Sequence, residues 1–310
     1  MKRIYITTGD PDGIGLEVTA KALFKIGPQK EVQFVIFRSS YKAKKWIELI
    51  EKKFKRKEVN KFNSNLTTCS STLIDVNSSE PAPLWFKQSI KLCLKNPHHK
   101  IVTGPLSKAS FYEANLKVMG HTGLLKSVTK KKNLFMAFKG QYFNVLLATD
   151  HVPLSIVSKK LSLEHLKKAV DAAKVFKASL SQKLAHKPIA FVGLNPHAGD
   201  RGLIGKEELL KLTPFLEKFD KKEIIGPLVP DAAFLKENWN KYSLYICLYH
   251  DQGLIPFKAI HGQDSGAHIT IGLPFTRVSV DHGTAKDIFN KNKANPSSMI
   301  EAIEYALTSN

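Results

Sequence analysis

The sequence predicts an α/β protein in which mostly parallel strands are covered by helices on both faces. Short runs of apolar, β-branched and aromatic residues recur along the chain, and several are followed by segments of helical periodicity. Uninterrupted apolar runs are typical of strands that are buried on both faces. The chain has 310 residues, of which 43% are hydrophobic and 24% charged. This length suits two packed domains of about 150 residues each, or one large α/β unit.

The expected elements alternate along the chain. The first strand leads into a glycine-rich turn and a helix, and residues 41–54 form a basic amphipathic pattern. Residues 55–80 are rich in Asn, Ser and Thr, which favours loops with short edge strands, and we expect His98 and His99 to be solvated. Strands are expected at residues 2–8, 32–37, 100–103, 134–139, 143–149, 188–195, 243–251 and 268–277, and helices after residues 15, 41, 84, 108, 120, 162, 206 and 298.

A strongly basic composition can indicate binding to nucleic acid. The formal net charge is +20, with 47 Lys and Arg against 27 Asp and Glu. The lysines are spread along the whole chain, and no zinc finger, helix-turn-helix signature or basic stripe interleaved with aromatic residues accompanies them. We therefore expect a solvated lysine-rich surface that attracts phosphorylated small molecules, and no nucleic-acid partner.

Cysteine use and hydropathy point to a cytoplasmic protein without a membrane segment. The three cysteines, Cys69, Cys93 and Cys247, form no spaced framework, which fits a reducing compartment. No apolar run approaches the roughly 20 residues that span a bilayer, and the N-terminal residues have no signal-peptide pattern.

Three histidines follow directly after apolar runs: His151, His197 and His250. Open α/β sheets bind ligands at the carboxyl ends of their strands, so three imidazoles delivered there can converge on one metal ion. Imidazole ligands favour zinc or cobalt over magnesium. The alternative is that each histidine is a hydrogen-bonded structural residue at a strand end.

Other polar positions have two interpretations each. Asp10 and Glu17 flank a glycine turn that favours anions but equally suits a structural strand-to-helix turn. Thr103, Ser107 and Lys108 are either anion contacts or a helix cap with a surface lysine. His121 and Thr122 open a helix whose amides can hold a phosphate. Asp231 is either a helix cap or an outer-shell carboxylate of the metal site.

Seven motifs together resemble one family. They are Gly9-Asp-Pro-Asp-Gly-Ile-Gly, Thr103-Gly-Pro-Leu-Ser-Lys, Gly120-His-Thr-Gly, Ala148-Thr-Asp-His-Val-Pro-Leu, Gly193-Leu-Asn-Pro-His-Ala-Gly, Tyr249-His-Asp-Gln-Gly-Leu and Val278-Ser-Val-Asp-His-Gly-Thr-Ala. In this order, and over nearly the whole chain, they are similar to the 4-hydroxythreonine-4-phosphate dehydrogenases of vitamin B6 (pyridoxine 5'-phosphate) biosynthesis.

The resemblance implies the fold of isocitrate and isopropylmalate dehydrogenases, two α/β/α domains with a cleft between them, working as a homodimer. The implied domains are residues 1–125 with 272–310, and residues 126–271. It also implies that His151, His197 and His250 bind a divalent metal (Zn, Co, Mg or Mn), with one of them supplied by the partner subunit.

The resemblance assigns further residues by position. Substrate contacts are implied for His121, Thr122, Lys258, His268 and Arg277, where His268 stands in place of a family Asn. The segment from His282 to Asn295 is similar to the nucleotide-binding loop of the decarboxylating dehydrogenases, which implies NAD or NADP contacts from His282, Gly283, Thr284, Ala285 and Asn295. The expected catalytic set is Asp251, Asp231 and Lys258.

The activity that the resemblance implies is NAD(P)-dependent, metal-dependent oxidation of 4-phosphooxy-L-threonine, followed by decarboxylation to 3-amino-2-oxopropyl phosphate. Three alternatives stay open on the residues: a dehydrogenase for another phosphorylated hydroxy acid, a metal-dependent phosphatase or hydrolase, and a non-enzymatic basic binding protein.

Overall fold

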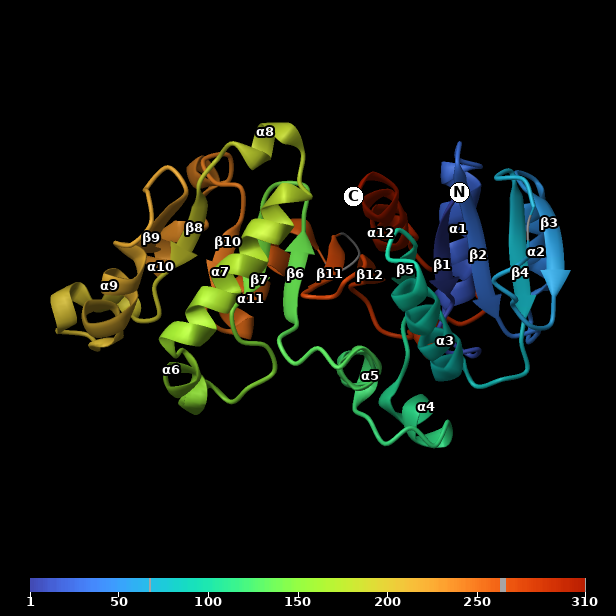
Figure 1. Cartoon of the computed structure of the whole chain (residues 1–310), viewed down its shortest axis with the longest axis horizontal. Helices are drawn as coiled ribbons and strands as arrows, with labels where there is room; N and C mark the ends of the chain where they lie inside the picture. The colour runs from blue at the N-terminus through green and yellow to red at the C-terminus, as the bar shows by residue number, and fades with distance from the viewer. Residues whose placement is uncertain (67, 263–265, 310) are drawn as a thin grey trace. The chain divides into compact units, whose positions relative to one another are not determined.

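The computed structural model describes residues 1–66, 68–262 and 266–309 (Figure 1). The chain divides into two compact units. Unit 1 comprises Met1–Leu134, Gln263–Ile269 and Leu273–Asn310, and unit 2 comprises Phe135–Gly262 and Thr270–Gly272. These units are defined by packing, and the domains expected from the sequence stay a prediction.

Unit 1 is a sheet with helices on both faces. Its strand order is β3-β4-β2-β1-β5-β12-β11, parallel except for the antiparallel pair β11 and β12. The strands are β1 (Lys2–Thr7), β2 (Val32–Arg38), β3 (Lys55–Val59), β4 (Thr72–Asn77), β5 (Lys100–Thr103), β11 (Ala267–Ile271) and β12 (Arg277–Val280). The helices are α1 (Gly15–Ile26), α2 (Lys44–Glu51), α3 (Ala82–Lys95), α4 (Lys108–Glu113), α5 (Gly120–Thr129) and α12 (Ser297–Thr308).

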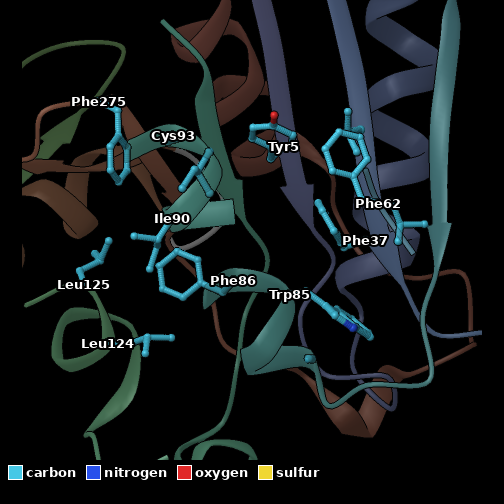
Figure 2. Packing of buried hydrophobic residues seen from close by; sticks show 14 of the residues in the cluster. Tyr5, Phe37, Phe62, Trp85, Phe86, Ile90, Cys93, Leu124, Leu125 and Phe275 are labelled. Carbon is cyan, nitrogen blue, oxygen red and sulfur yellow. The ribbon is translucent and has the colours of Figure 1, made fainter. Parts of the chain in front are cut away.

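A core cluster of unit 1 lies between α3 and the sheet. Trp85 and Phe86 of α3 are almost fully buried and pack with Tyr5 and Phe37 from the strands (Figure 2). Successive strand residues point to opposite faces, so Phe34, next to this set on β2, is free to pack against Phe54 beyond α2. Because both faces of the sheet are covered, β2 is buried along its whole length and β1 is buried from Arg3 onward.

Unit 2 repeats the layered design with the strand order β6-β7-β10-β8-β9. The strands β7, β10, β8 and β9 are parallel, and β6 is antiparallel to β7. The strands are β6 (Phe135–Lys139), β7 (Asn144–Leu147), β8 (Ile189–Val192), β9 (Ile224–Leu228) and β10 (Tyr245–Cys247), and the helices are α6 (Val157–Lys160), α7 (Leu163–Ala178), α8 (Gln182–Ala185), α9 (Thr213–Leu216), α10 (Pro230–Ala233) and α11 (His250–His261). Short 3₁₀ and π segments complete the unit, among them η2 (Pro196–Gly202) and η3 (Glu208–Leu212).

Three expectations about elements were wrong. The strand expected at 243–251 is only β10, and α11 already begins at His250. The strand expected at 268–277 is two antiparallel strands, because Gly272 adopts φ 105° and turns the chain between them. Within the polar segment 55–80, β4 is a buried inner strand rather than an edge strand, and Asp75 on it forms a 2.6 Å ion pair with Arg38 of β2.

The expectation that His99 is solvated was also wrong. His99 is 9% exposed, accepts the backbone N–H of Arg3 and packs edge-on to Tyr5. Burial, with the nearby charge of Arg3 as a smaller cause, lowers the pKa of His99 to about 4. His98, one residue earlier, is exposed as expected.

In the described part of the chain, no helix is both long enough and apolar enough to cross a bilayer. Cys93 and Cys247 are buried and Cys69 is exposed, all as free thiols.

Candidate functional site

The three strand-end histidines of unit 2 follow neighbouring strands. β10 lies between β7 and β8, and all three run parallel, so their carboxyl ends meet at one edge of the sheet. His151 follows β7, His250 follows β10, and His197 follows β8. The positions expected from the sequence are therefore adjacent in the order of strands.

His151 and His250 form a close pair. Their ring centroids are 5.1 Å apart with an interplanar angle of 36°. The Oδ1 atom of Asp251 lies 2.7 Å from Nδ1 of His250. A carboxylate on Nδ1 holds the ring and leaves Nε2 for another partner, which is the usual arrangement around a metal-binding histidine.

His197 lies in an unusual left-handed segment. His197, Ala198, Asp200 and Arg201 have φ values of 53°, 51°, 39° and 55°, and Gly199 between them has φ 80°. Left-handed backbone costs a non-glycine residue about 1–2 kcal/mol. Such conformations persist only where the surrounding structure imposes them, and they cluster at functional sites. The His197 side chain is exposed.

The complete ligand set stays a prediction. Across residues 1–66, 68–262 and 266–309, no group of three or more His, Cys, Asp or Glu side chains is arranged to hold a metal ion. The contact between His151 and His250 is the part of the expected set that the structure shows directly.

Arg277 and His121 of unit 1 share an aromatic neighbour. Arg277, which begins β12, is 2% exposed and donates from Nη2 to Oγ1 of Thr103 at 2.6 Å. Its guanidinium carbon stands 5.7 Å from the centroid of the Phe86 ring, and the His121 ring is 5.1 Å from the same centroid. Phe111 packs edge-on against His121 as well. Neither phenylalanine stands out in the sequence, because both belong to ordinary core patterns.

Burial alters the protonation of both groups. Desolvation, with the charge of Arg277 as the second cause, holds the pKa of His121 well below its usual value, so the imidazole is neutral at pH 7. Burial lowers the pKa of Arg277 to about 9. Among the described residues, the buried Nε2 atom of His121 has no hydrogen-bond partner. A buried polar atom of this kind is costly unless a ligand pairs with it.

The remaining expected substrate contacts are spread over other elements. His268 on β11 lies opposite Ser279 of β12, and its Nδ1 is 2.9 Å from that hydroxyl. Ser279 is also the register partner of Thr103, so His268 and Thr103 share a face of the sheet. Thr122 lies in the first turn of α5, where backbone amides favour an anion. Lys258 belongs to unit 2, in the last turn of α11.

The helix-cap interpretation is supported at Ser107. Ser107 caps α4 by accepting the N–H of Ser110, and Asp10 accepts the N–H of Ser107 and the hydroxyl of Ser110. Asp231 is exposed within the first turn of α10, whose N-cap is Val229, so it is not the cap that one interpretation expected.

The expected nucleotide loop packs against the glycine turn after β1. Ile14 donates to the carbonyl of Thr284, and Glu17 accepts the N–H of Ala294. Gly13 is needed here, since a Cβ on it would stand 3.0 Å from the Thr284 carbonyl oxygen. Asn295 accepts from the N–H and hydroxyl of Ser297 at the start of α12.

The same loop keeps features that suit a ligand. Nε2 of His282 is buried without a hydrogen-bond partner in the described ranges. No described atom lies within 4 Å of the point where a Cβ on Gly283 would stand, so the backbone there is open to close approach. Ala285 adopts a left-handed conformation with φ 43°.

The fold first defines a class of α/β proteins. The structure matches isocitrate dehydrogenase from Methylococcus capsulatus with a TM-score of 0.52, covering 99% of this chain and 85% of that chain. The sequence identity is 14%, so this likeness concerns the fold alone. The fold class expected from the sequence is confirmed.

Within that class the comparisons define the family. The family model for the pyridoxal phosphate biosynthetic protein PdxA matches residues 17–306, and the chain belongs to this family. 4-Hydroxythreonine-4-phosphate dehydrogenase from Sulfurihydrogenibium sp. (strain YO3AOP1) is 34% identical over 322 residues, covering 99% of this chain and 98% of that protein. D-threonate 4-phosphate dehydrogenase from Pectobacterium atrosepticum is 30% identical over 325 residues, with the same coverage.

A solved structure agrees with this assignment. 4-Hydroxythreonine-4-phosphate dehydrogenase from Klebsiella pneumoniae matches with a TM-score of 0.76 and 27% identity, covering 99% of this chain and 97% of that chain. Because these relatives are named as dehydrogenases, a phosphatase, a hydrolase or a basic binding protein is not favoured.

Proposed function

We propose that the chain is an NAD(P)-dependent dehydrogenase that oxidises the 3-hydroxyl of 4-phosphooxy-L-threonine. The C3 hydride goes to the nicotinamide and the hydroxyl proton leaves, which gives a β-keto acid that loses CO₂ to form 3-amino-2-oxopropyl phosphate. The observation that carries the proposal is the PdxA family match over residues 17–306.

In this proposal the substrate phosphate is bound around Arg277 and His121. A buried guanidinium gives a phosphate two parallel charge-assisted hydrogen bonds. The His121 ring, whose Nε2 atom has no partner among the described residues, is the other proposed contact. Thr122 and the first amides of α5 favour the same anionic group, and Lys258 and His268 complete the proposed contacts.

His151, His197 and His250 would hold a divalent metal ion. The His151–His250 pair and the carboxylate on Nδ1 of His250 fit such an ion, because neutral imidazoles with outer-shell carboxylates are usual ligands. When bound, the ion would act as a Lewis acid toward the substrate hydroxyl. Imidazole ligands favour Zn²⁺ or Co²⁺ over Mg²⁺ or Mn²⁺.

The carboxylates would orient groups and accept the hydroxyl proton. Asp251 holds His250 by its 2.7 Å contact with Nδ1, and Asp231 and Lys258 are the proposed partners for proton transfer.

The nicotinamide cofactor would contact the loop that begins at His282. The unpaired Nε2 of His282 and the open backbone at Gly283 support this assignment. Thr284, Ala285 and Asn295 are the other proposed contacts. The same loop would serve NAD or NADP.

The proposed assembly is a homodimer in the cytoplasm, with one histidine of each metal site supplied by the partner subunit. Leu203, Leu209 and Leu210, close to His197 in sequence, are exposed by 83%, 51% and 71%. Exposed apolar side chains on this segment are the proposed contact with the second subunit.

A turnover assay tests the function directly. The full-length protein is incubated with 4-phosphooxy-L-threonine and NAD or NADP, before and after chelation, and nicotinamide reduction is followed at 340 nm. We expect reduction that chelation abolishes and Zn²⁺ or Co²⁺ restores. D-threonate 4-phosphate serves as the comparison substrate because one relative is named for it. Faster turnover of that compound, or phosphate release without reduction, would contradict the proposal.

A further inference from the structure

Gln252 connects two of the strand ends in unit 2. Its side chain is 9% exposed and lies in the first turn of α11, two residues after His250. Oε1 accepts the N–H of Leu248, just beyond β10, and Nε2 donates to the carbonyl of Gly193, just beyond β8. One buried amide therefore joins the segment that leads to His250 and the segment that leads to His197.

Glu208 holds the second of these segments. Its carboxylate is 3% exposed and accepts the N–H groups of Leu194 and Asn195 at 2.6 and 2.8 Å, and the side-chain amide of Asn195 at 2.8 Å. Gly199 passes so close that a Cβ there would stand 2.8 Å from Oε2. The carboxylate thus contacts both ends of the chain stretch that contains His197.

Thr149 makes the corresponding link on the other side of β10. Its hydroxyl is buried and donates to the carbonyl of Leu248 at 2.7 Å. Thr149 precedes His151 by two residues, and Leu248 precedes His250 by two residues. The close pair His151 and His250 is therefore joined through the backbone that carries it.

We propose that Gln252 and Glu208 are positioning residues that hold His250 and His197 in the geometry needed to bind a divalent cation. The inference rests on the proposed metal-dependent function. Burying an amide or a carboxylate costs desolvation free energy, and hydrogen bonds to the buried group offset that cost. Here these bonds join separate strand ends next to the histidines, and residues that orient ligands in this way set metal affinity.

A matched control lies at the opposite ends of the same strands. Asn144, 2% exposed at the start of β7, donates from Nδ2 to the carbonyl of Ser243 ahead of β10. It is a buried amide that joins two neighbouring strands, as Gln252 is, but it lies away from the histidines. Removing it has a similar structural cost without a change in ligand geometry.

The test measures Co²⁺ binding to the metal-free full-length protein by competition with a chelator, together with the visible absorption spectrum of the bound ion. Gln252→Met, Glu208→Gln and Asn144→Leu are compared with the wild type, and His197→Ala serves as the reference. We expect Gln252→Met and Glu208→Gln to weaken Co²⁺ binding by roughly 10- to 100-fold and to alter the spectrum, with Asn144→Leu within about twofold of the wild type.

Each outcome decides something. Wild-type affinity and spectrum in both Gln252→Met and Glu208→Gln would overturn the inference, as would an equal loss in Asn144→Leu. If Gln252→Met fails to fold, Glu208→Gln still tests the inference, and the isosteric Thr149→Val tests the corresponding link between the His151 and His250 segments, where weaker binding is expected as well. If His197→Ala binds Co²⁺ as tightly as the wild type, the proposed metal site itself is wrong, which is a separate result.

Discussion

His99 and His121 both have a lowered pKa, for reasons that differ between the two. His99 loses its proton easily because it is packed between Tyr5 and the backbone of Arg3. His121 does so because aromatic rings surround it and Arg277 adds a positive charge nearby. His250 instead has a carboxylate partner. The same residue type is therefore structural in one place and a candidate ligand contact in another.

The first prediction concerns stability against pH. The pKa of His99 is about 4 in the folded chain and near 6.5 when unfolded. Since the unfolded state binds the proton first, this contribution to stability is complete above about pH 6.5 and is lost as the pH falls toward 4. Between pH 7 and pH 5 we expect His99→Gln to remove about 2 kcal/mol of the pH dependence of unfolding.

Urea unfolding at the two pH values measures this quantity. The exposed neighbour His98 supplies the control, because its charge is the smallest contribution to the lowered pKa of His99, so His98→Gln should leave most of the difference between the two pH values in place. A His99→Gln protein with the full wild-type pH dependence would show that another group is responsible.

The second prediction concerns Arg277. Lysine keeps the positive charge but loses the planar fork and the 2.6 Å bond to Thr103. We expect Arg277→Lys to raise KM for the phosphorylated substrate by about tenfold, or about 1.4 kcal/mol, with a smaller effect on kcat. Arg38→Lys is the control, since Arg38 is also a buried arginine of unit 1 but pairs with Asp75. An unchanged KM in Arg277→Lys would argue against phosphate binding at this residue.

At the scale of elements, the turn between β8 and η3 is the most strained part of the described chain around the histidines. Gly199 and the four non-glycine residues around it, His197, Ala198, Asp200 and Arg201, all adopt a left-handed backbone conformation. Regular helices do not need such support, whereas this segment is held by the carboxylate of Glu208 and the amide of Gln252. The strain lies on the element that carries His197, as is common at functional sites.

The third prediction uses two glycines of this element. Gly199 and Gly202 both have positive φ, 80° and 93°, so alanine is strained at either position by about 1 kcal/mol. At Gly202 the new methyl group meets the flexible end of Leu209, whereas at Gly199 it meets the hydrogen-bonded carboxylate of Glu208. We expect Gly199→Ala to lose about 1–3 kcal/mol more than Gly202→Ala in thermal or urea unfolding, because the carboxylate has to move. Equal losses would show that the carboxylate is not held in place.

At the scale of the molecule, the surface determines two properties: the electrostatic attraction of anions and the association with a second chain. An excess of 20 positive charges raises the local concentration of anionic small molecules, in a way that salt weakens. Leu203, Leu209 and Leu210, which lie near η3 in unit 2, are exposed apolar side chains. Both features suit an enzyme that binds a phosphorylated substrate and associates with a second copy.

The fourth prediction is the mass in solution. Light scattering on the eluting protein should give twice the 34.7 kDa of one chain. We expect Leu210→Lys to weaken the dimer by about tenfold or more, because a charge would be buried in the interface, and to reduce metal content with it. Leu94→Lys, on the exposed side of α3, is the control and should leave the mass unchanged. A fully active wild-type monomer would contradict the shared metal site.

Local patterns were enough to predict much of this protein. Apolar runs, periodicity and turn residues predicted β1, β2, β6, β7, the helices α1, α3, α7 and α12, and the histidines that follow three strands, and the ordered motifs predicted the family. Tertiary structure decided that β4 is an inner strand, that His99 is buried, that Arg277 begins a separate strand, and that Gln252 and Glu208 join the strand ends. The physical reason is range: backbone preference and periodicity act over a few residues, whereas burial and hydrogen-bond partners depend on segments that meet only after the sheet has formed.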